Sequence, residues 1–384
     1  TQSTHSITKK ELSKKQSVEA ETSNPPQDQI NAVVALYQSG EMTKTEQACR
    51  ELLQIYPQTL IVMNVLGGAL NGQGKWQEAV QVFDKAIQLK PDYVEAFNNR
   101  GNTLKNLGQL DEALKNYDRA IQLKPDYIEA YNNRGIALKK LGQLDDALKN
   151  YDKAIQLKPD YAEAYNNRGN ALRELGQLEQ AIQNYDRAIQ LKPDYVEAYY
   201  NQAILVHQLG RLDEALKNYD KAIQLKPDYV KAYSNRGVTL QALGQLEEAI
   251  QSYDKAIQLK PDFAEAYSNQ GVTLGGQGKL KESIRVFDKA IQLKPDYTEA
   301  YSNLLMTLNY IPHLNAVEHI ELARKFGEIV TNKVRSHSPD YQCLPTPERL
   351  RVGLVSGDLR IHPVGYFLES VLSSMDPSRI ELIA

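Results

Sequence analysis

The residues best suited to acid–base chemistry lie near the C-terminal end of the sequence. His362 stands four positions after Asp358 in the stretch SGDLRIHP. An imidazole titrates near neutral pH and can therefore take up or release a proton under working conditions. A single histidine is more often structural than catalytic, so the elements around His362 decide whether this chemistry is expected.

The segment around His362 has the pattern of an α/β domain. Residues 351–356 form an apolar run typical of a buried parallel strand, and residues 364–375 follow with a helical pattern. Residues 379–384 are expected to form the next strand. This order begins a doubly wound domain, whose ligands bind at the carboxyl ends of the strands. We therefore expect the loop that carries Asp358 and His362 to lie at a binding site.

Carboxylates and cysteines elsewhere do not indicate a second site. Asp111, Glu112 and Asp118 recur in nearly every copy of a repeated unit, with lysines and arginines nearby, which is typical of a solvated helix face. The two cysteines, Cys49 and Cys343, have neither a disulfide framework nor a metal-binding spacing. Cys49 is expected to be a small buried hydrophobe. We expect no metal site and no cofactor.

Internal repetition dominates the middle of the chain. The string [KR]AIQLKPD occurs seven times at steps of 34 residues, with its proline at Pro91, Pro125, Pro159, Pro193, Pro227, Pro261 and Pro295. A unit this short cannot bury an apolar face alone, so successive units must stack into a solenoid that has no single core.

One unit, residues 94–127, contains two helical patterns joined by a turn at 107–109. In the first helix, one stripe at i, i+4 and i+7 holds Phe97, Gly101 and Leu104. In the second helix, the matching stripe holds Ala113, Tyr117 and Ala120. Because glycine is costly inside a helix, we expect Gly101 to mark a close approach of the second helix. Pro125 ends the second helix.

This unit resembles the tetratricopeptide repeat (TPR) family, whose motif has an aromatic residue, Gly, Leu, Ala, Tyr and Pro at these places. The resemblance implies an all-α fold, a right-handed superhelix of helical hairpins. One departure is an arginine where the family usually has leucine, at Arg100, Arg134, Arg168 and Arg236.

The repeats predict the following organisation. We expect a disordered N-terminal tail (1–25), a degenerate TPR (26–59), seven TPR repeats of 34 residues (60–297), a partial TPR with capping helices (298–335), a linker (336–349) and an incomplete α/β segment (350–384).

A row of asparagines is the candidate binding surface. From residue 94 on, the sixth position of each unit is Asn99, Asn133, Asn167, Asn201, Asn235, Asn269 and Asn303. A primary amide offers two donors and one acceptor and can pair with the main chain of a bound peptide. The row resembles the asparagine ladder of the O-GlcNAc transferase superhelix, where the first helices line the concave surface. The alternative is that asparagine was copied along when one unit was duplicated.

A row of acids accompanies the asparagines at the second position. It consists of Glu95, Glu129, Glu163, Glu197, Glu265 and Glu299, with Lys231 as the one base. Carboxylates repel a carboxylate. We therefore do not expect the carboxylate clamp by which some TPR adaptors hold the end of a peptide.

After the repeats, the strings LRVGLVSGD and HPVGYFLES resemble the opening of the catalytic region of the O-GlcNAc transferase and SPINDLY-like glycosyltransferase family. The matching residues are Val355, Ser356, Asp358, His362 and Pro363, and Leu359 departs from the pattern. The resemblance implies that residues 350–384 are the first β-α-β elements of an incomplete GT-B α/β domain. It also implies that His362 is catalytic, near the acceptor hydroxyl and the sugar donor, with Asp358 in support.

By this resemblance, the whole protein would transfer GlcNAc from UDP-GlcNAc to serine or threonine of protein acceptors without a metal, whereas residues 1–384 alone would be inactive. Two alternatives stay open. One is a SPINDLY-like O-fucosyltransferase that uses GDP-fucose, and the other is a non-enzymatic TPR scaffold.

Composition limits the other partners. The formal net charge of −3 gives no electrostatic reason to expect nucleic acid or an anionic membrane. No run of about 18 apolar residues occurs, and residues 1–29 lack the apolar core of a signal peptide. These features favour a cytoplasmic protein whose partners are protein or peptide acceptors. A homodimer formed through the TPR units is one open arrangement.

Overall fold

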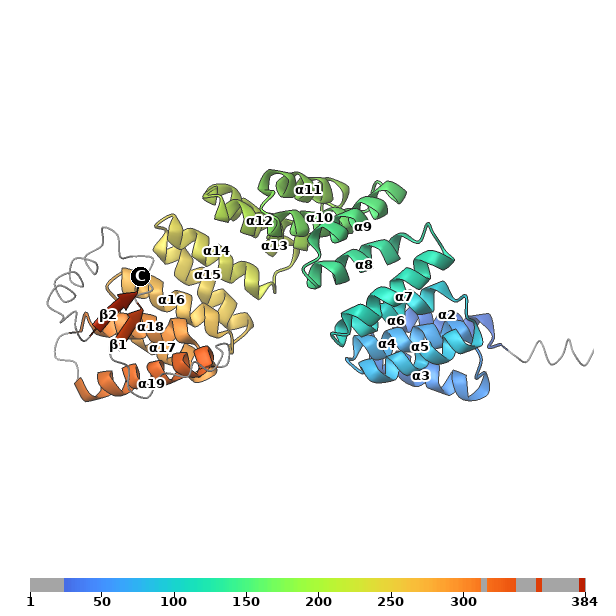
Figure 1. The fold of residues 1–384 in the computed structure, drawn as a ribbon, viewed down its shortest axis with the longest axis horizontal. Coiled ribbons are helices and arrows are strands. Elements are labelled where there is room, and N and C mark those ends of the chain that lie inside the picture. The colour runs from blue at the N-terminus through green and yellow to red at the C-terminus, as the bar shows by residue number, and fades with distance from the viewer. Residues whose placement is uncertain (1–23, 312–315, 336–349, 354–379, 384) are drawn as a thin grey trace, which may run out of the picture. The chain divides into compact units, whose positions relative to one another are not determined.

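The computed structural model describes residues 24–311, 316–335, 350–353 and 380–383 of the chain (Figure 1). Those residues divide between two units, Thr1–Leu293 and Lys294–Ala384. The first unit contains α2 (Gln27–Gln38), α3 (Met42–Ile55), α4 (Leu60–Gly72), α5 (Trp76–Leu89), α6 (Val94–Asn106), α7 (Leu110–Leu123), α8 (Ile128–Lys140), α9 (Leu144–Leu157), α10 (Ala162–Glu174), α11 (Leu178–Leu191), α12 (Val196–Gln208), α13 (Leu212–Leu225), α14 (Val230–Ala242), α15 (Leu246–Leu259), α16 (Ala264–Gly276) and α17 (Leu280–Leu293). The second contains α18 (Thr298–Leu308), α19 (Ala316–Arg335), β1 (Leu350–Gly353) and β2 (Ile380–Ile383).

Each repeat is a hairpin of a first helix, here helix A, and a second, helix B. In repeat 94–127 these are α6 and α7, joined by the predicted turn around Gly108. Gly108 has φ 78°, a left-handed conformation that favours glycine. The amide of Gln109 then donates to the carbonyl of Leu104 at 2.9 Å, which closes the end of helix A. The turn between the two helices is confirmed.

A glycine–tyrosine contact joins the two helices of a hairpin. A Cβ atom added at Gly101 would lie 2.7 Å from Cε1 of Tyr117, whose side chain is fully buried. Ala113 and Ala120 on the same helix are fully buried as well. The expected close approach at Gly101 is therefore confirmed, and it is the reason that a glycine is kept inside helix A.

The aromatic residue of helix A is not part of this core, contrary to the prediction for Phe97. Phe97 is half-buried, and its neighbour Ala96 is the fully buried residue. In the next repeat the equivalent ring reaches back over the preceding turn, where the Tyr131 hydroxyl donates to the Pro125 carbonyl at 3.2 Å. The small alanine is placed in the helix contact, and the large ring covers the turn.

Consecutive repeats are held together by an ion pair that explains the unusual arginine. Arg134, on helix A, donates through Nε to Oδ1 of Asp118, on the preceding helix B, at 2.7 Å. Arg168 pairs in the same way with Asp152, at 2.7 Å. The pairs Arg100–Asp84 and Arg236–Asp220 repeat the arrangement at 2.8 and 2.6 Å. The arginine thus replaces an apolar contact by a polar one between neighbouring repeats.

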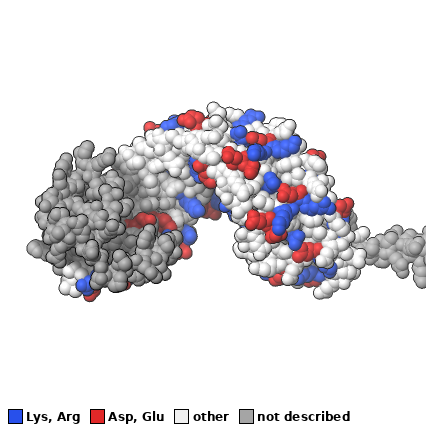
Figure 2. All heavy atoms as spheres, in the orientation of Figure 1, with Lys and Arg blue, Asp and Glu red and all other residues white. Residues whose placement is uncertain are grey.

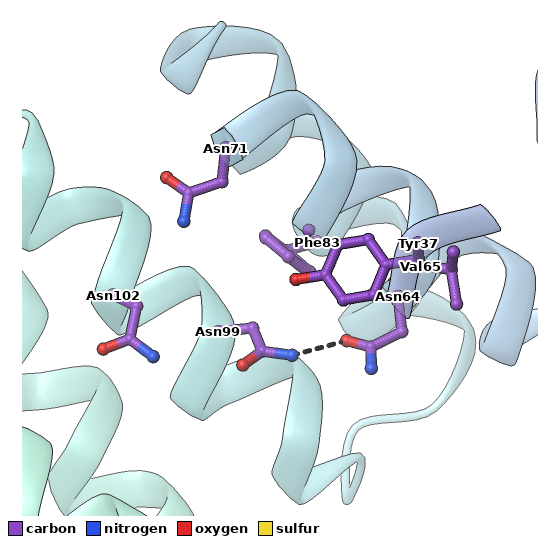
Figure 3. A pocket seen from close by; sticks show the side chains of 8 residues that line it. Tyr37, Asn64, Val65, Asn71, Phe83, Asn99 and Asn102 are labelled. Atoms are coloured by element: carbon purple, nitrogen blue, oxygen red, sulfur yellow. Dashed lines mark hydrogen bonds between the residues drawn. The ribbon is translucent and has the colours of Figure 1, made fainter. Parts of the chain in front are cut away.

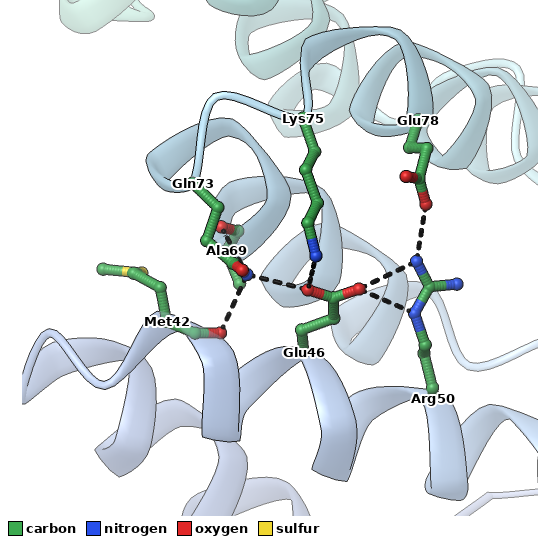
Figure 4. A network of polar contacts seen from close by, with 7 residues as sticks. All are labelled: Met42, Glu46, Arg50, Ala69, Gln73, Lys75 and Glu78. Carbon is green, nitrogen blue, oxygen red and sulfur yellow. Dashed lines mark hydrogen bonds and ion pairs between the residues drawn. The ribbon is translucent and has the colours of Figure 1, made fainter.

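The degenerate first repeat, α2 and α3, is joined to the next one by a buried carboxylate (Figure 4). Glu46 accepts hydrogen bonds from Lys75 Nζ at 2.7 Å and Gln73 Nε2 at 2.8 Å. Arg50 donates to it from the same helix at 3.0 Å. Cys49 is fully buried, as expected, and burial raises the pKa of its thiol to about 12.

In the second unit, α18 packs against α19, with the rings of Tyr301 and Phe326 stacked at 6.4 Å. The strands β1 and β2 pair in parallel, with Leu350 opposite Ile380. The predicted strands began at 351 and 379, within one residue of the observed starts. The loop and helix predicted between them lie outside the described residues, so the GT-B assignment stays a prediction.

Candidate peptide-binding groove

The asparagine row lies on helix A of successive repeats, and its members within the first unit are half-buried. Repeat positions are counted here from the first residue of each 34-residue unit, so that Asn133 is position 6 of repeat 128–161. Its neighbour at position 5, Asn132, is buried. The pair of adjacent amides places one side chain inside the stack of repeats and the other at its surface.

The asparagines of the row are hydrogen-bonded to the preceding repeat. Asn133 Nδ2 donates to Oδ1 of Asn98, at position 5 of the preceding unit, at 3.0 Å. The same bond recurs as Asn99–Asn64 at 2.9 Å, Asn167–Asn132 at 3.0 Å and Asn201–Asn166 at 2.9 Å, and as Asn235 to the Tyr200 hydroxyl at 3.1 Å. One amide proton is therefore used within the chain, which fixes the orientation of the amide. Sequence reasoning identified position 6 but missed its partner at position 5, although the dipeptide NN was repeated.

A hollow of about 180 Å³ lies beside the first members of the row (Figure 3). Its walls are Tyr37, Asn64, Val65, Gly68, Asn71, Phe83, Asn99 and Asn102. Figure 3 shows the amides of Asn64 and Asn99 joined by their hydrogen bond, with Asn71 and Asn102 nearby. Positions 6, 9 and 12 of helix A therefore contribute to the lining of this hollow.

A second hollow, of about 190 Å³, lies at repeats 196–229 and 230–263. It is lined by Ile204, His207, Gln208, Tyr219, Asn235 and Val238, again from positions 6, 9 and 12 of helix A and their neighbours. Here Ala203 replaces the glycine that elsewhere accepts the tyrosine ring. Tyr117 donates to Asn102 of its own repeat, but the equivalent Tyr219 lies beside Asn235 of the next repeat. The hollow thus lies where both the glycine and the partner of the tyrosine hydroxyl differ from those of repeat 94–127.

The glutamate row lies beside a row of rings at the residue that precedes each of these helices: Tyr93, Tyr127, Tyr161, Tyr195, Tyr229, Phe263 and Tyr297. Glu129 and Glu163 are close enough to Tyr161 that their charges, added to the larger effect of burial, raise its pKa to about 12. A lysine lies over each ring of this row, with Nζ 4.7 to 5.7 Å from the ring centroid. Lys192 also pairs with Glu163 at 3.0 Å. Sequence reasoning missed these lysine–ring pairs, although each LKPDY string contained one.

The acids on the outer helices are solvated, as predicted. Asp111, Glu112 and Asp118 are exposed, and Lys115 pairs with Glu112 at 2.6 Å. Figure 2 shows basic and acidic side chains interspersed over the described part of the face in view. Glu112 and Asp118 belong to surface ion pairs, with Lys115 and Arg134.

The residues predicted for catalysis, Asp358 and His362, lie outside the described residues. Within the described part of the chain, no group of three or more His, Cys, Asp or Glu side chains is arranged to hold a metal ion. Across those same residues, none of the helices combines the length and the apolar character needed to cross a bilayer.

A stack of helical hairpins with a hollowed surface on its first helices defines a repeat protein of the kind that binds peptides or other proteins. Models of the TPR repeat match residues 67–108, 101–142, 137–172, 169–210, 205–244 and 239–278, and a tetratricopeptide repeat model matches residues 264–297. The chain belongs to the TPR family.

One solved structure supports the fold, and two others are similar over shorter parts of the chain. The crystal structure of the APC/C hetero-tetramer Cut9-Hcn1 matches with a TM-score of 0.56 and 14% identity, over 70% of this chain and 52% of that one. This chain therefore spans about half the length of the chain that it matches. YrrB, a TPR protein with an unusual peptide-binding site, is 27% identical over 49% of this chain and 96% of its own, with a TM-score of 0.39. MamA is 28% identical over 43% and 96%, with a TM-score of 0.39. No protein with a curated description matches the sequence.

Proposed function

We propose that the hollowed surface of the A helices, here the groove, binds extended segments of other proteins through their main chain. The asparagine row supports this most strongly. At Asn167, the hydrogen bond to Asn132 of the preceding repeat holds the amide in one orientation and leaves its second N–H and its Oδ1 for a ligand. A fixed amide loses little entropy when a peptide binds. Because the contacts are to the main chain, sequences that differ in their side chains bind alike.

Substitution of three central asparagines tests the proposal. Asn167→Ala, Asn201→Ala and Asn235→Ala together remove up to three hydrogen bonds to the peptide, each worth about 1 kcal/mol. We expect dissociation constants to rise about tenfold to a hundredfold, by similar factors for peptides of unrelated sequence. Fluorescence anisotropy with labelled peptides measures this.

A matched control uses asparagines on the B helices. Asn116, Asn150 and Asn184 are buried and each donates to the main chain of its own helix at 2.8 Å. Replacing these three by alanine removes these bonds, and also those that Asn116 and Asn184 accept from Arg100 and Arg168 at 3.4 and 3.3 Å, but changes no residue of the groove. Peptide binding should therefore be unchanged. Weakening of only one peptide sequence by the groove variant, or equal weakening by both variants, would refute the proposal.

A second proposal concerns the whole protein. We propose that it is a protein O-glycosyltransferase, in which the groove presents acceptor chains to a catalytic region that begins at residue 350. The support is the match of Val355, Ser356, Asp358, His362 and Pro363 to the O-GlcNAc transferase pattern, together with the parallel pairing of β1 and β2 on either side of that motif. UDP-GlcNAc is the proposed donor. GDP-fucose, or no donor at all in a scaffold protein, are the alternatives.

Transfer assays on the complete protein discriminate between these three readings. Radiolabelled UDP-GlcNAc and GDP-fucose are offered separately with one protein acceptor, and donor binding is followed by calorimetry. Label from UDP-GlcNAc supports the first reading, and label from GDP-fucose the second. His362→Ala should abolish transfer while peptide binding in the groove is kept. If neither nucleotide sugar binds, the enzyme proposal is wrong and the scaffold stands.

A further inference from the structure

A row of basic residues runs along the groove at position 12 of three consecutive A helices. Lys105, Lys139 and Arg173 occupy this position on α6, α8 and α10, and all three are half-buried. Position 12 is also that of Asn71 and His207, which line the two hollows. By the equivalence of the repeats, the basic row forms the same wall of the groove between those hollows.

Position 12 of one repeat faces position 13 of the next. Asn106 Nδ2 donates to Asn71 Oδ1 at 3.1 Å, and Lys139 Nζ lies 2.8 Å from Glu174 Oε1. In the repeat between these two pairs, the equivalent residues are Lys105 and Lys140. Lys105 thus faces Lys140, whereas the equivalent residue Lys139 faces Glu174.

The environment of Lys105 is unfavourable for a cation without an anionic ligand. Burial, and then the charge of Lys140, lower the pKa of Lys105. Its hydrogen bond to Asn102 Oδ1 is long, at 3.4 Å, and that oxygen already accepts from the Tyr117 hydroxyl at 2.9 Å. A lysine near the C-terminal end of a helix interacts favourably with the helix dipole, but an exposed lysine does this as well. The helix dipole therefore does not explain why Lys105 is half-buried beside another lysine.

Arg173 supplies a second, independent observation. Its Nη1 is buried and has no hydrogen-bond partner among the described residues. Buried donors in folded proteins are normally paired, and an arginine fork matches the geometry of a carboxylate. The wall therefore has cationic donors in two places, at Lys105 with Lys140 and at Arg173.

We propose that this wall binds acidic side chains of the chain held in the groove, with one carboxylate bridging Lys105 and Lys140 and another reaching Arg173. The proposal rests on the peptide-binding function proposed above and adds a preference for acidic segments. The glutamate row at position 2 lies ten residues away along each A helix, about 15 Å at 1.5 Å per residue. Acidic side chains of the bound chain are repelled by the glutamate row and attracted by the basic row, and this difference sets the position of the bound chain in the groove.

The test compares three labelled peptides of one length, which differ only at two central positions that hold Glu, Gln or phosphoserine. We expect the Glu peptide to bind the wild-type protein about tenfold more tightly than the Gln peptide. Lys140→Glu places a carboxylate where Glu174 stands in the next repeat and should reduce that preference, leaving only the part that comes from Arg173. Glu174→Lys releases Lys139 from its ion pair and should increase the preference.

Lys115→Glu is the matched control, because it makes the same change of net charge on an exposed side chain of helix B. It should leave the preference unchanged. Equal affinities for the Glu and Gln peptides would overturn the acidic preference and leave the peptide-binding function standing. Failure of both peptides to bind would overturn both proposals. If phosphoserine binds more tightly than Glu and is equally sensitive to Lys140→Glu, the site is for phosphate and the assignment to carboxylates is wrong.

Discussion

Replacing Glu46 by glutamine tests how the first repeat is attached to the array. Glu46 is 9% exposed and accepts hydrogen bonds from Lys75 and Gln73, which belong to the turn after α4 (Figure 4). The hydrogen bond from Lys75 is the largest cause that lowers the pKa of its carboxyl, from 4.5 to about 2. Glu46→Gln keeps the shape of the side chain and removes the charge.

The size of the effect follows from the pKa. A lowering from 4.5 to about 2 corresponds to about 3 kcal/mol, since one pKa unit is worth about 1.4 kcal/mol. The side chains of Lys75 and Arg50 are 41% and 46% exposed, so solvent screens part of this. We expect Glu46→Gln to cost about 1–2 kcal/mol at neutral pH.

The pH dependence has a definite sign. Because the folded-state pKa is below the unfolded one, the stabilisation is fully present above about pH 5 and is lost as the pH falls towards 2. The difference between wild type and Glu46→Gln should therefore shrink as the pH falls over that range. In an array of coupled repeats the loss should stay local. Hydrogen exchange should show reduced protection in α2 and α3 and little change in α9 to α11.

Glu51→Gln is the control, because Glu51 is exposed on the same helix and its hydrogen bond is to Gln47. It should have no measurable effect. A stability difference for Glu46→Gln that is the same at neutral pH and at pH about 3, or a loss of protection spread evenly over the array, would refute the reasoning.

Two further predictions concern the contacts within and between repeats. Gly169→Ala places a Cβ 2.7 Å from Cε1 of Tyr185, so the ring must move. We expect the free energy of unfolding, measured in urea, to fall by about 1–3 kcal/mol. Gly276→Ala is the control, because nothing lies within 4 Å of its added Cβ, and it should give a small gain. Arg168→Met removes the 2.7 Å ion pair with Asp152 and should lower the free energy of unfolding by about 0.5–1 kcal/mol. A double-mutant cycle with Asp152→Asn should give a coupling energy that falls in about 1 M NaCl. A coupling energy that does not change with salt would contradict an ionic origin.

The sequence was sufficient to predict the hairpins but not the contacts between them. The period of 34 residues followed from the recurring string. The turn at Gly108 and the approach at Gly101 followed from glycines, which are favoured where φ is positive or where there is no room for a side chain. Phe97 was assigned wrongly to the core because both it and Ala96 fit an apolar stripe, and only the packing of neighbours decides between them. The hydrogen-bond partners of the asparagine row lie 35 residues away, a spacing that differs from the repeat period of 34. Asn133 contacts Asn98, 35 residues earlier, and this offset is set by the stacking of repeats.

The same offset of 35 residues explains why the contacts of the basic row were not predicted from the sequence. A period of 34 shows that Lys105 and Lys139 are equivalent, but it does not show that Lys105 faces Lys140 while Lys139 faces Glu174. At the C-terminal end, the strands were predicted within one residue of their starts because short apolar runs bounded by polar loops are a local signal. Parallel pairing followed from the helical pattern between them.

The offset of 35 also bears on whether the asparagine row was merely copied along with the repeat. If the asparagine at position 6 served only to join repeats, it would be expected to change with its partner at position 5. That partner is Asn132 for Asn167, Tyr200 for Asn235 and Ser234 for Asn269, and among the described residues no hydrogen bond joins Ser234 to Asn269. The asparagine is kept while the residue at position 5 changes from an amide to a phenol and then to a hydroxyl with no hydrogen bond to it among the described residues. Stacking alone does not require this, whereas a groove that pairs with the main chain of a ligand explains an amide in each repeat from residue 94 on; repeat 60–93 has Val65 at this position.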